Sequence, residues 1–427
     1  RVPGAGNLRL RPCPQLRVAT IISKMRVLMF GWEYPPYAAG GLATATLALA
    51  NGLVRRGHAV TMVVPFPAAA GEGGVRVVSA SDVSANLRVL RVASPLSPYA
   101  ASSLPTAPWA RRTGPTAYRD TLFEDVSDFA VAARRIAAEH PHDIIHVHDW
   151  MTYAAGHEAR EVSGRPLVAH IHATEHDRSG AWTHPGILAR ERDGLRDADR
   201  VIANSHVTKR HIVDEYGVAA DNVDVVHWGI EPPDDGDLHL PSPFGAGVPI
   251  VAFVGRLAMQ KGPDYFIEAA AKVVARHPTV CFVVGGAGDM LPMLFDRCIA
   301  LRIAHRVYFT GGLTRVETER LYRIASVVVM PSVSEPFGLV ALESLRAGTP
   351  VIISRTSGVA EAIANLVTVE FWDVNDIADK ILAVVNDPVL ARELRERTNE
   401  ELHDLRLGPD EPARLTVESY ELATTGP

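Results

Sequence analysis

Short apolar runs alternate with longer amphipathic segments along most of the chain from Met25 onward. The first half contains the strand-like runs RVLMF, AVTMVV, DIIHV, PLVAHI, RVIAN and VDVVH. A second series, starting at Pro249, contains PIVAFV, TVCFVV, RVYFT, SVVVM, PVII and LVTV. Helical patterns such as LATATLALANGLVRR, which ends at Gly57, stand between the runs. Apolar strands that alternate with helices predict parallel sheets covered on both faces.

The two series of strands are separated by residues 231–248, EPPDDGDLHLPSPFGAGV, which are rich in proline, glycine and aspartate and have no period. We interpret this segment as a linker between two Rossmann-like α/β domains, at 25–230 and 249–405, that face each other across a cleft. Residues 406–427 are expected to form a C-terminal helix, since DEPARL opens with acidic residues and an early proline.

Two other segments fit neither series. Residues 1–24 are basic but lack the apolar core of a signal peptide, and we interpret them as an unstructured extension. Residues 81–120 form a long irregular insertion in the first domain, which is a candidate lid over the cleft. Its stretch WARRTGP would suit peripheral contact with a membrane surface, although a solvated loop is the favoured interpretation.

The composition narrows the class of protein. The 427 residues are 47% hydrophobic and 22% charged, and 43 basic against 49 acidic side chains give a formal charge of -6. This slight acidity argues against nucleic acid as a partner. No apolar stretch is long enough to span a membrane, and the three cysteines show no spacing typical of a metal site. A reduced, cytoplasmic setting is expected.

Ligands of open parallel sheets bind outside the carboxyl ends of the strands, so the segments that follow the strands are the candidates for a site. Five of them carry reactive or binding groups: GWEYPPYAAGGLA, HDW, HATEHDR, GRLAMQKG and SEPFGLVALE. In the last, Glu335 lies on the loop that leaves a strand, and Glu343 lies about two turns into the following helix. A helix N-terminus between two carboxylates favours an anion flanked by hydroxyl groups.

Cations and glycines on two other loops could also meet an anion. Arg256 and Lys261 share the loop GRLAMQKG, where a guanidinium and an ammonium group could hold a diphosphate. A single pair of basic residues on a loop is more often solvated than part of a binding site. The glutamate loop at the same edge of the sheet favours the interpretation as a diphosphate-binding site. Gly40 and Gly41 could let a phosphate approach a helix N-terminus, and a structural turn is an equal alternative.

Histidines are frequent near the ends of two first-domain strands. His146 and His148 alternate along one strand, and His170 and His172 along another, so each pair shares a strand face. His172 and His176 are four residues apart with Glu175 between them, but His172 stands at a strand exit, so this pair does not lie on one face of a helix as the ligands of such zinc sites do, and we expect no metal ion. We interpret His170 as a core residue and His172, at the strand exit, as a residue of the cleft.

In combination and in this order, these motifs resemble the retaining family 4 glycosyltransferases of the GT-B fold, most closely bacterial glycogen or starch synthase-like members. The resemblance runs from Met25 to about Glu421 and rests on GRLAMQKG, MPSVSEPFGLVALE and SRTSGVAEAI, followed by HDW, HIHATEHDR and WEYPPYAAGGLA. It implies that the C-terminal helix crosses back to the first domain. One position departs from the pattern, since Ala38 stands where glycogen synthases carry a lysine two residues before the glycine pair.

The resemblance implies roles for the residues of the glutamate loop. Glu335 would contact the transferred sugar, and Glu343 would bind the ribose of the nucleotide. The backbone N–H groups of Gly338 and Leu339 would meet the diphosphate, together with the glycine pair Gly40-Gly41.

It implies roles on the remaining loops as well. Arg256 and Lys261 would stabilise the charge of the leaving diphosphate without a metal ion. His172 would bind the donor sugar, and Asp149 of HDW would be an active-site acid.

The activity that the resemblance implies is transfer of a sugar, most simply glucose, from ADP-glucose or UDP-glucose to a glucan or other glycan, with retention of configuration and no cofactor. Two alternatives stay open. One is retaining transfer to a lipid, a small sugar or a cell-surface glycan. The other is epimerisation of a nucleotide sugar by an enzyme of the same fold.

Overall fold

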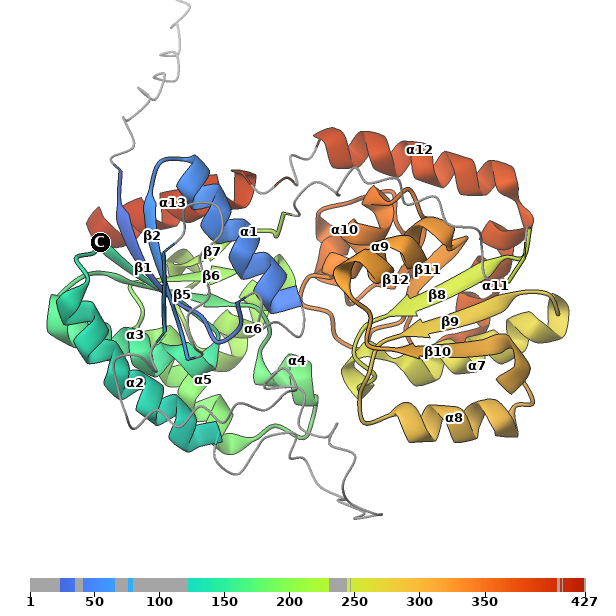
Figure 1. Cartoon of the computed structure of the whole chain (residues 1–427), viewed down its shortest axis with the longest axis horizontal. Helices are drawn as coiled ribbons and strands as arrows, with labels where there is room; N and C mark the ends of the chain where they lie inside the picture. The colour runs from blue at the N-terminus through green and yellow to red at the C-terminus, as the bar shows by residue number, and fades with distance from the viewer. Residues whose placement is uncertain are drawn as a thin grey trace, which may run out of the picture.

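The computed structural model describes residues 24–34, 41–65, 76–79, 122–229, 244–245, 247–404, 408 and 410–425. Its helices and strands form two α/β units side by side, with the two sheets in different halves of the picture (Figure 1). The predicted extension up to residue 23, the insertion at 81–120, most of the linker, Ala38 and Gly40 lie outside the described residues.

The first sheet has seven strands, all parallel, in the order β3-β2-β1-β4-β5-β6-β7. They are β1 (Arg26–Phe30), β2 (Ala59–Val64), β3 (Arg76–Ser79), β4 (Ile144–His148), β5 (Leu167–Ile171), β6 (Arg200–Ala203) and β7 (Val223–Val225). The helices between them are α1 (Gly41–Arg55), α2 (Leu122–Glu139), α3 (Trp150–Ser163), α4 (Glu175–Ser179), α5 (Pro185–Asp197) and α6 (His206–Tyr216).

The second sheet has six parallel strands in the order β10-β9-β8-β11-β12-β13. They are β8 (Ile250–Val254), β9 (Cys281–Gly285), β10 (Val307–Gly311), β11 (Val327–Met330), β12 (Val351–Ser354) and β13 (Val367–Val369). The helices of this half are α7 (Pro263–Arg276), α8 (Leu291–Ala300), α9 (Arg315–Ile324), α10 (Leu339–Arg346), α11 (Val374–Asn386) and α12 (Pro388–Asp404). Helix α13 (Asp410–Thr425) ends the described chain.

In both sheets the order in which strands are added reverses at the first strand. The second and third strands lie on one side of it, and the fourth lies on the other. This is the doubly wound order, which leaves a crevice at the carboxyl ends of the central strands. The predicted fold class, two Rossmann-like units with parallel sheets, is confirmed. The domain bounds given above stay predictions.

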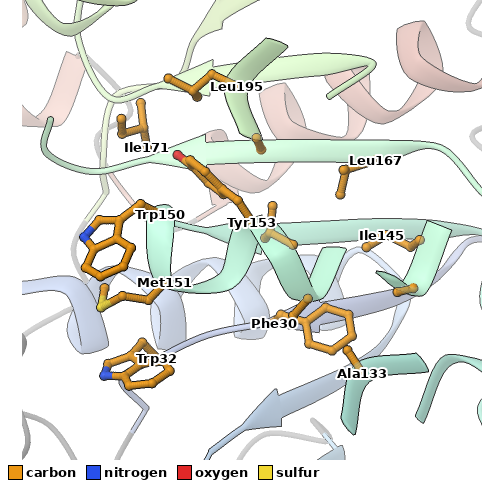
Figure 2. Close-up of a cluster of buried hydrophobic side chains, with 14 of the residues drawn as sticks. Phe30, Trp32, Ala133, Ile145, Trp150, Met151, Tyr153, Leu167, Ile171 and Leu195 are labelled. Atoms are coloured by element: carbon orange, nitrogen blue, oxygen red, sulfur yellow. The ribbon is translucent and has the colours of Figure 1, made fainter. Parts of the chain in front are cut away.

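Alternation along the strands divides the core of the first unit between the two faces of its sheet. Leu28 and Phe30 of β1 pack into the cluster under α2 and α3, which Figure 2 shows around Trp150 and Tyr153. Val27 and Met29, the intervening residues of β1, pack into the cluster under α1 and α13. In β1 the even-numbered residues therefore face α2 and α3, and the odd-numbered residues face α1 and α13.

Helix α13 packs against the first sheet, far in sequence from the strands that it covers (Figure 1). Its residues Ala413, Val417 and Tyr420 are fully buried in the cluster that contains α1. These three residues, at positions i, i+4 and i+7, form one buried apolar stripe, whereas Leu422 is half exposed. Helix α12, which precedes it, contacts α10 and α11 of the second unit.

Candidate active site

Two loops of the second unit interlock at the carboxyl edge of its sheet. Gly262 has φ +63°, and a Cβ atom there would lie 2.1 Å from the carbonyl oxygen of Pro331. The backbone N–H of Val333 donates to the carbonyl oxygen of Gln260 at 2.9 Å. A glycine is therefore required for the loop after β8 to approach the loop after β11 so closely.

This approach brings together two of the predicted site residues. Lys261 Nζ donates to Glu335 Oε2 at 2.6 Å, and the hydroxyl of Ser332 donates to the same oxygen at 3.2 Å. Glu335 is buried, and its backbone carbonyl accepts from the N–H of Gly358 at 2.9 Å. The carboxylate is held by a cation on one side and by its own loop on the other.

Arg256 lies on the same loop as Lys261 but contacts a different group. Its Nη2 donates to Gln260 Oε1 at 3.0 Å. Its charge opposes the effect of burial on Asp289, a carboxyl group whose pKa is raised mainly by burial. The loop thus holds two cations, and the structure pairs one of them with Glu335.

Helix α10 begins after Gly338, which has φ +114° and is closely surrounded by Glu335, Met330 and Val359. Glu343 is the fifth residue of α10 and lies little more than one turn from its start, not two as the sequence suggested, because each turn takes about 3.6 residues.

The carboxyl group of Glu343 is held in place by a buried phenol. It accepts a 3.0 Å hydrogen bond from the hydroxyl of Tyr322, and burial raises the pKa of this carboxyl group. Its orientation is therefore fixed before any ligand arrives.

The N-termini of two helices meet at this edge, one from each unit. Gly41 is the first residue of α1, and a Cβ atom there would lie 3.3 Å from Leu339 Cδ1, at the first residue of α10. It would also lie 3.9 Å from the ring of Trp228. Each helix N-terminus carries a partial positive charge and unpaired N–H groups, so their meeting point favours an anion.

Further contacts cross between the two units beside this point. Ser334, next to Glu335, donates from its hydroxyl to Asp177 Oδ1 at 2.7 Å. The carboxylate of Glu361 accepts from the backbone N–H groups of His206 and Val207, the first residues of α6, at 2.7 and 2.8 Å. The loops that carry the second unit's candidate residues are thus tied to the first unit.

In the first unit, His172 and Asp149 lie next to each other at the ends of β5 and β4. The backbone N–H of His172 donates to Asp149 Oδ1 at 2.8 Å, and its Nε2 lies 2.8 Å from His148 Nδ1. His172 is only 5% exposed, and burial lowers its pKa well below the usual range, so the ring is neutral.

Asp149 has an unusual backbone and an unusual carboxyl group. Its φ of +58° is a left-handed conformation that is costly for a residue with a side chain. Burial raises the pKa of its carboxyl group to about 7, and the charge of Arg178 opposes that shift. Strain and a perturbed pKa together mark functional positions more often than structural ones.

The sequence interpretation did not anticipate that four histidines would form one cluster. The rings of His146, His148, His170 and His172 pack on one face of β4 and β5, with centroids of successive rings 4.3–4.4 Å apart along each strand. His148 is the register partner of His170. The signal was present as HVH and HIH, but only the register of the two strands shows that both pairs share a face. Trp228 was also missed, because no motif marks it, and Ser334, which opens the motif SEPFGLVALE, was given no role.

Comparisons with known proteins cover nearly the whole chain. Residues 39–233 match the family model described as Glycosyltransferase Family 4, and residues 239–401 match the one described as Glycosyl transferases group 1. A glycosyltransferase of Methanocaldococcus jannaschii is 30% identical over 93% of this chain and 98% of its own length. A glycogen synthase of Mycobacterium tuberculosis is 28% identical, over 86% of this chain and 88% of its own.

Other similar proteins carry different names. A D-inositol 3-phosphate glycosyltransferase of Nocardiopsis dassonvillei is 32% identical over 67% of this chain and 71% of its own. Among solved structures, sucrose-phosphate synthase from Thermosynechococcus elongatus has a TM-score of 0.72 at 22% identity, covering 94% of this chain and all of the other. Anabaena HepE in complex with UDP-glucose has a TM-score of 0.67 at 18% identity, covering 93% and 99%. These structural likenesses establish the fold.

Proposed function

Because the chain belongs to the group 1, family 4 glycosyltransferases, we propose that it transfers glucose from a nucleoside-diphosphate glucose to a glycan acceptor, with retention of configuration at the transferred carbon. The nucleotide sugar is a co-substrate, and the reaction needs no cofactor.

One observation carries this proposal: Gly41, the first residue of α1, lies against the side chain of Leu339, the first residue of α10, and the preceding Gly338 lies against Glu335 of the Lys261–Glu335 pair. A diphosphate at this point would receive N–H groups from two helices. Lys261 would supply a mobile positive charge, and Arg256 a planar one from the same loop. The charge that develops on the leaving diphosphate would then be stabilised by groups that are already in place.

The neighbouring carboxylates fit the two ends of the donor. Glu335 would accept hydrogen bonds from sugar hydroxyls, and its pairing with Lys261 fixes where its oxygens lie. Glu343, held by Tyr322, would accept from the ribose hydroxyls. A carboxylate takes two or more hydrogen bonds from a diol, which gives specificity for a sugar over water.

The first unit would meet the sugar with neutral groups. His172 is uncharged and buried, so it can share a hydrogen bond with a hydroxyl group of the sugar without competing for the diphosphate. The acceptor hydroxyl would attack on the face from which the diphosphate leaves, so that the configuration is retained. Contacts such as Ser334–Asp177 would keep water out while the bond breaks.

A glycan is the acceptor that we favour, supported by the similarity to a glycogen synthase over 86% of the chain. The similarity to D-inositol 3-phosphate glycosyltransferases supports a small phosphorylated polyol as the second candidate. No helix among the described residues is both long and apolar enough to cross a membrane. A peripheral membrane contact and a cytoplasmic location stay predictions.

The experiment is a matrix of donors and acceptors. ADP-glucose, UDP-glucose, GDP-mannose and UDP-N-acetylglucosamine are first screened by thermal shift, because a ligand that binds the folded state raises the melting temperature. Release of nucleotide is then followed with oligoglucan, with inositol phosphate, and with no acceptor, and the linkage of the product is determined by NMR.

We expect a glucose donor to stabilise the protein and to yield an α-linked product with oligoglucan. Product formation with inositol phosphate but not with oligoglucan would show that the acceptor is a small phosphorylated polyol and not a glycan. Interconversion of the nucleotide sugar without an acceptor would favour the epimerase. Absence of stabilisation by every nucleotide sugar would refute the donor site itself.

A further inference from the structure

A second set of potential ligand groups lies on the face of the first sheet that α1 and α13 cover. His146 and His148 are two residues apart on β4 and point to the same face, and His170 stands beside His148 on β5. One ring nitrogen of each of the three residues lies within 4.8 Å of the others. Among the described residues, no other group of three or more His, Cys, Asp or Glu residues meets that distance.

The hydrogen bonds of these rings leave at least one nitrogen of each ring without a partner. His146 Nδ1 shares a 2.6 Å hydrogen bond with the hydroxyl of Tyr420, and His148 Nδ1 shares a 2.8 Å bond with His172 Nε2. When both Nδ1 atoms donate, both Nε2 atoms carry a lone pair. Metal-bound histidines are fixed in the same way, by a hydrogen bond from the nitrogen that does not bind the metal.

The remaining nitrogens have no partner within the described protein. They are Nε2 of His146, Nε2 of His148, and both ring nitrogens of His170, and the three side chains are at most 2% exposed. A buried polar atom without a partner costs roughly 1–3 kcal/mol. Burial also lowers the pKa of all three rings, to about 3 for His148, which keeps the rings in the neutral form that binds metals.

Space for a further ligand lies next to the cluster. A small cavity is lined by His170, His172 and Trp228 on one side and by apolar residues of α1 on the other. Pro412, near the start of α13, closes part of it. Of the three histidines of the cluster, His170 lines this cavity, so a fourth ligand such as a water molecule could reach an ion from that side.

We propose that His146, His148 and His170 bind one divalent transition-metal ion, with Zn²⁺ as the best fit. Three imidazole nitrogens and one open position are a donor set that tetrahedral Zn²⁺ uses, and imidazole is less suited to Mg²⁺ or Ca²⁺. Zn–N bonds of about 2.0–2.1 Å require the three nitrogens to draw closer, and the stacked rings of His146 and His148 to turn until their in-plane lone pairs converge on the ion. The expectation of no metal rested on helical spacing, and two parallel strands supply ligands without it.

The ion would not touch the proposed diphosphate site. The cluster reaches the donor side through His172, which is hydrogen bonded to His148. The site therefore goes beyond the proposed transferase activity, and either proposal can fail without the other.

The test uses the full-length protein, freed of metal by a chelator and desalted, and titrated with Co²⁺. We expect one equivalent to bind with the visible absorption of tetrahedral nitrogen ligation, and Zn²⁺ to displace it. His170→Phe, which removes two unpartnered nitrogens but keeps a planar ring, should abolish the signal. The matched control is His142→Phe in the same unit, because His142 is also buried but both its nitrogens are bonded, to His140 O and Ser163 Oγ.

Tyr420→Phe provides a second and milder variant, since it removes only the hydroxyl that orients His146. It should weaken Co²⁺ binding by about 10–100-fold, with the circular dichroism spectrum unchanged. The proposal is overturned if folded wild-type protein binds no stoichiometric Co²⁺. It is equally overturned if His170→Phe and Tyr420→Phe both bind as wild type does, which would assign the ion to surface histidines.

Discussion

The carboxyl edges of the two sheets offer opposite chemistry. At the second sheet, Lys261 and Glu335 form an ion pair at 2.6 Å, and Arg256 lies on the same loop. At the first sheet, the corresponding edge carries stacked imidazoles whose pKa values burial holds below the usual range. The first six strands of the first sheet have the same order as the six strands of the second, so the difference comes from a few loop and strand-end residues.

This difference separates two tasks that a transferase has to perform. Stabilising a leaving diphosphate needs fixed positive charge, which in the proposed function the second unit and the two helix N-termini would supply. Holding a sugar near a reacting acceptor needs hydrogen-bonding groups that do not themselves attract the diphosphate. Neutral, buried histidines meet that requirement. Substitutions at either edge test this division between charged and neutral groups.

The largest effect is expected at Glu335. Glu335→Gln should lower turnover by at least about a thousandfold, because an amide cannot accept from sugar hydroxyls on both atoms or balance Lys261. Folding should change little, since the residue is on a loop. Initial rates of nucleotide release measure the effect. Glu370→Gln, at a surface pair with Arg355, is the control and should keep full activity. Near-normal turnover in Glu335→Gln would remove the residue from the site.

The second prediction concerns the cation of the same pair. Lys261→Ala should lower turnover by about a hundredfold, because one preorganised charge beside the leaving group is lost. Affinity for the free nucleoside diphosphate should fall as well, and calorimetry measures it. Lys380→Ala removes a lysine that bonds Thr368 O and Asp376 elsewhere in the unit, so its kinetics should be unchanged. Equal losses in both variants would point to stability and not to charge.

The contrast between the edges also explains what the sequence could predict. Most strands begin and end within about two residues of their predicted bounds, because apolar runs between glycine and proline signals are local features. Strand β3, RVVS, was missed, although β6, β11 and β12 are equally short and were predicted. Glu335 and Lys261 were found because each lies in a contiguous strand–loop–helix motif. Their roles stay proposals.

The first unit's edge could not be predicted in the same way. The histidine cluster depends on the pairing of β4 with β5, and the bond of His146 to Tyr420 joins residues 274 positions apart. Neither is visible in a window of sequence. The position of Glu343 along α10 was misjudged for a different reason, because five residues reach little more than one turn of a helix. Contacts between residues far apart in the sequence therefore set the limit of what the sequence alone could predict.

The third prediction tests how the two edges are held together. Ser334→Ala removes the 2.7 Å hydrogen bond to Asp177. A hydrogen bond to a charged group contributes about 1.5 kcal/mol, which corresponds to about a tenfold change. We expect KM for the donor to rise by about that factor, with kcat less affected, and hydrolysis to increase relative to transfer. Ser127→Ala, whose hydroxyl bonds only its own helix, is the control. An unchanged ratio of hydrolysis to transfer would exclude a role in closure.

The smallest effect is expected at the opposite edge of the first sheet, where that unit carries an exposed ion pair. Arg26, which begins β1, donates three hydrogen bonds to Asp143 just before β4, and they hold the pKa of this carboxyl at about 2. A carboxyl whose folded pKa lies below its unfolded value stabilises the protein above about pH 4. That contribution is lost as the pH falls through about 2.

The partial exposure of both side chains keeps the contribution small. Urea midpoints of wild type and Asp143→Asn should therefore differ slightly at pH 7 and converge as the pH approaches 2. Added salt should shrink the gap at pH 7. A gap that grew on acidification would have the wrong sign for a depressed pKa. That result would show that Arg26 does not stabilise the ionised carboxyl of Asp143 at the amino ends of β1 and β4, the edge opposite the neutral histidines.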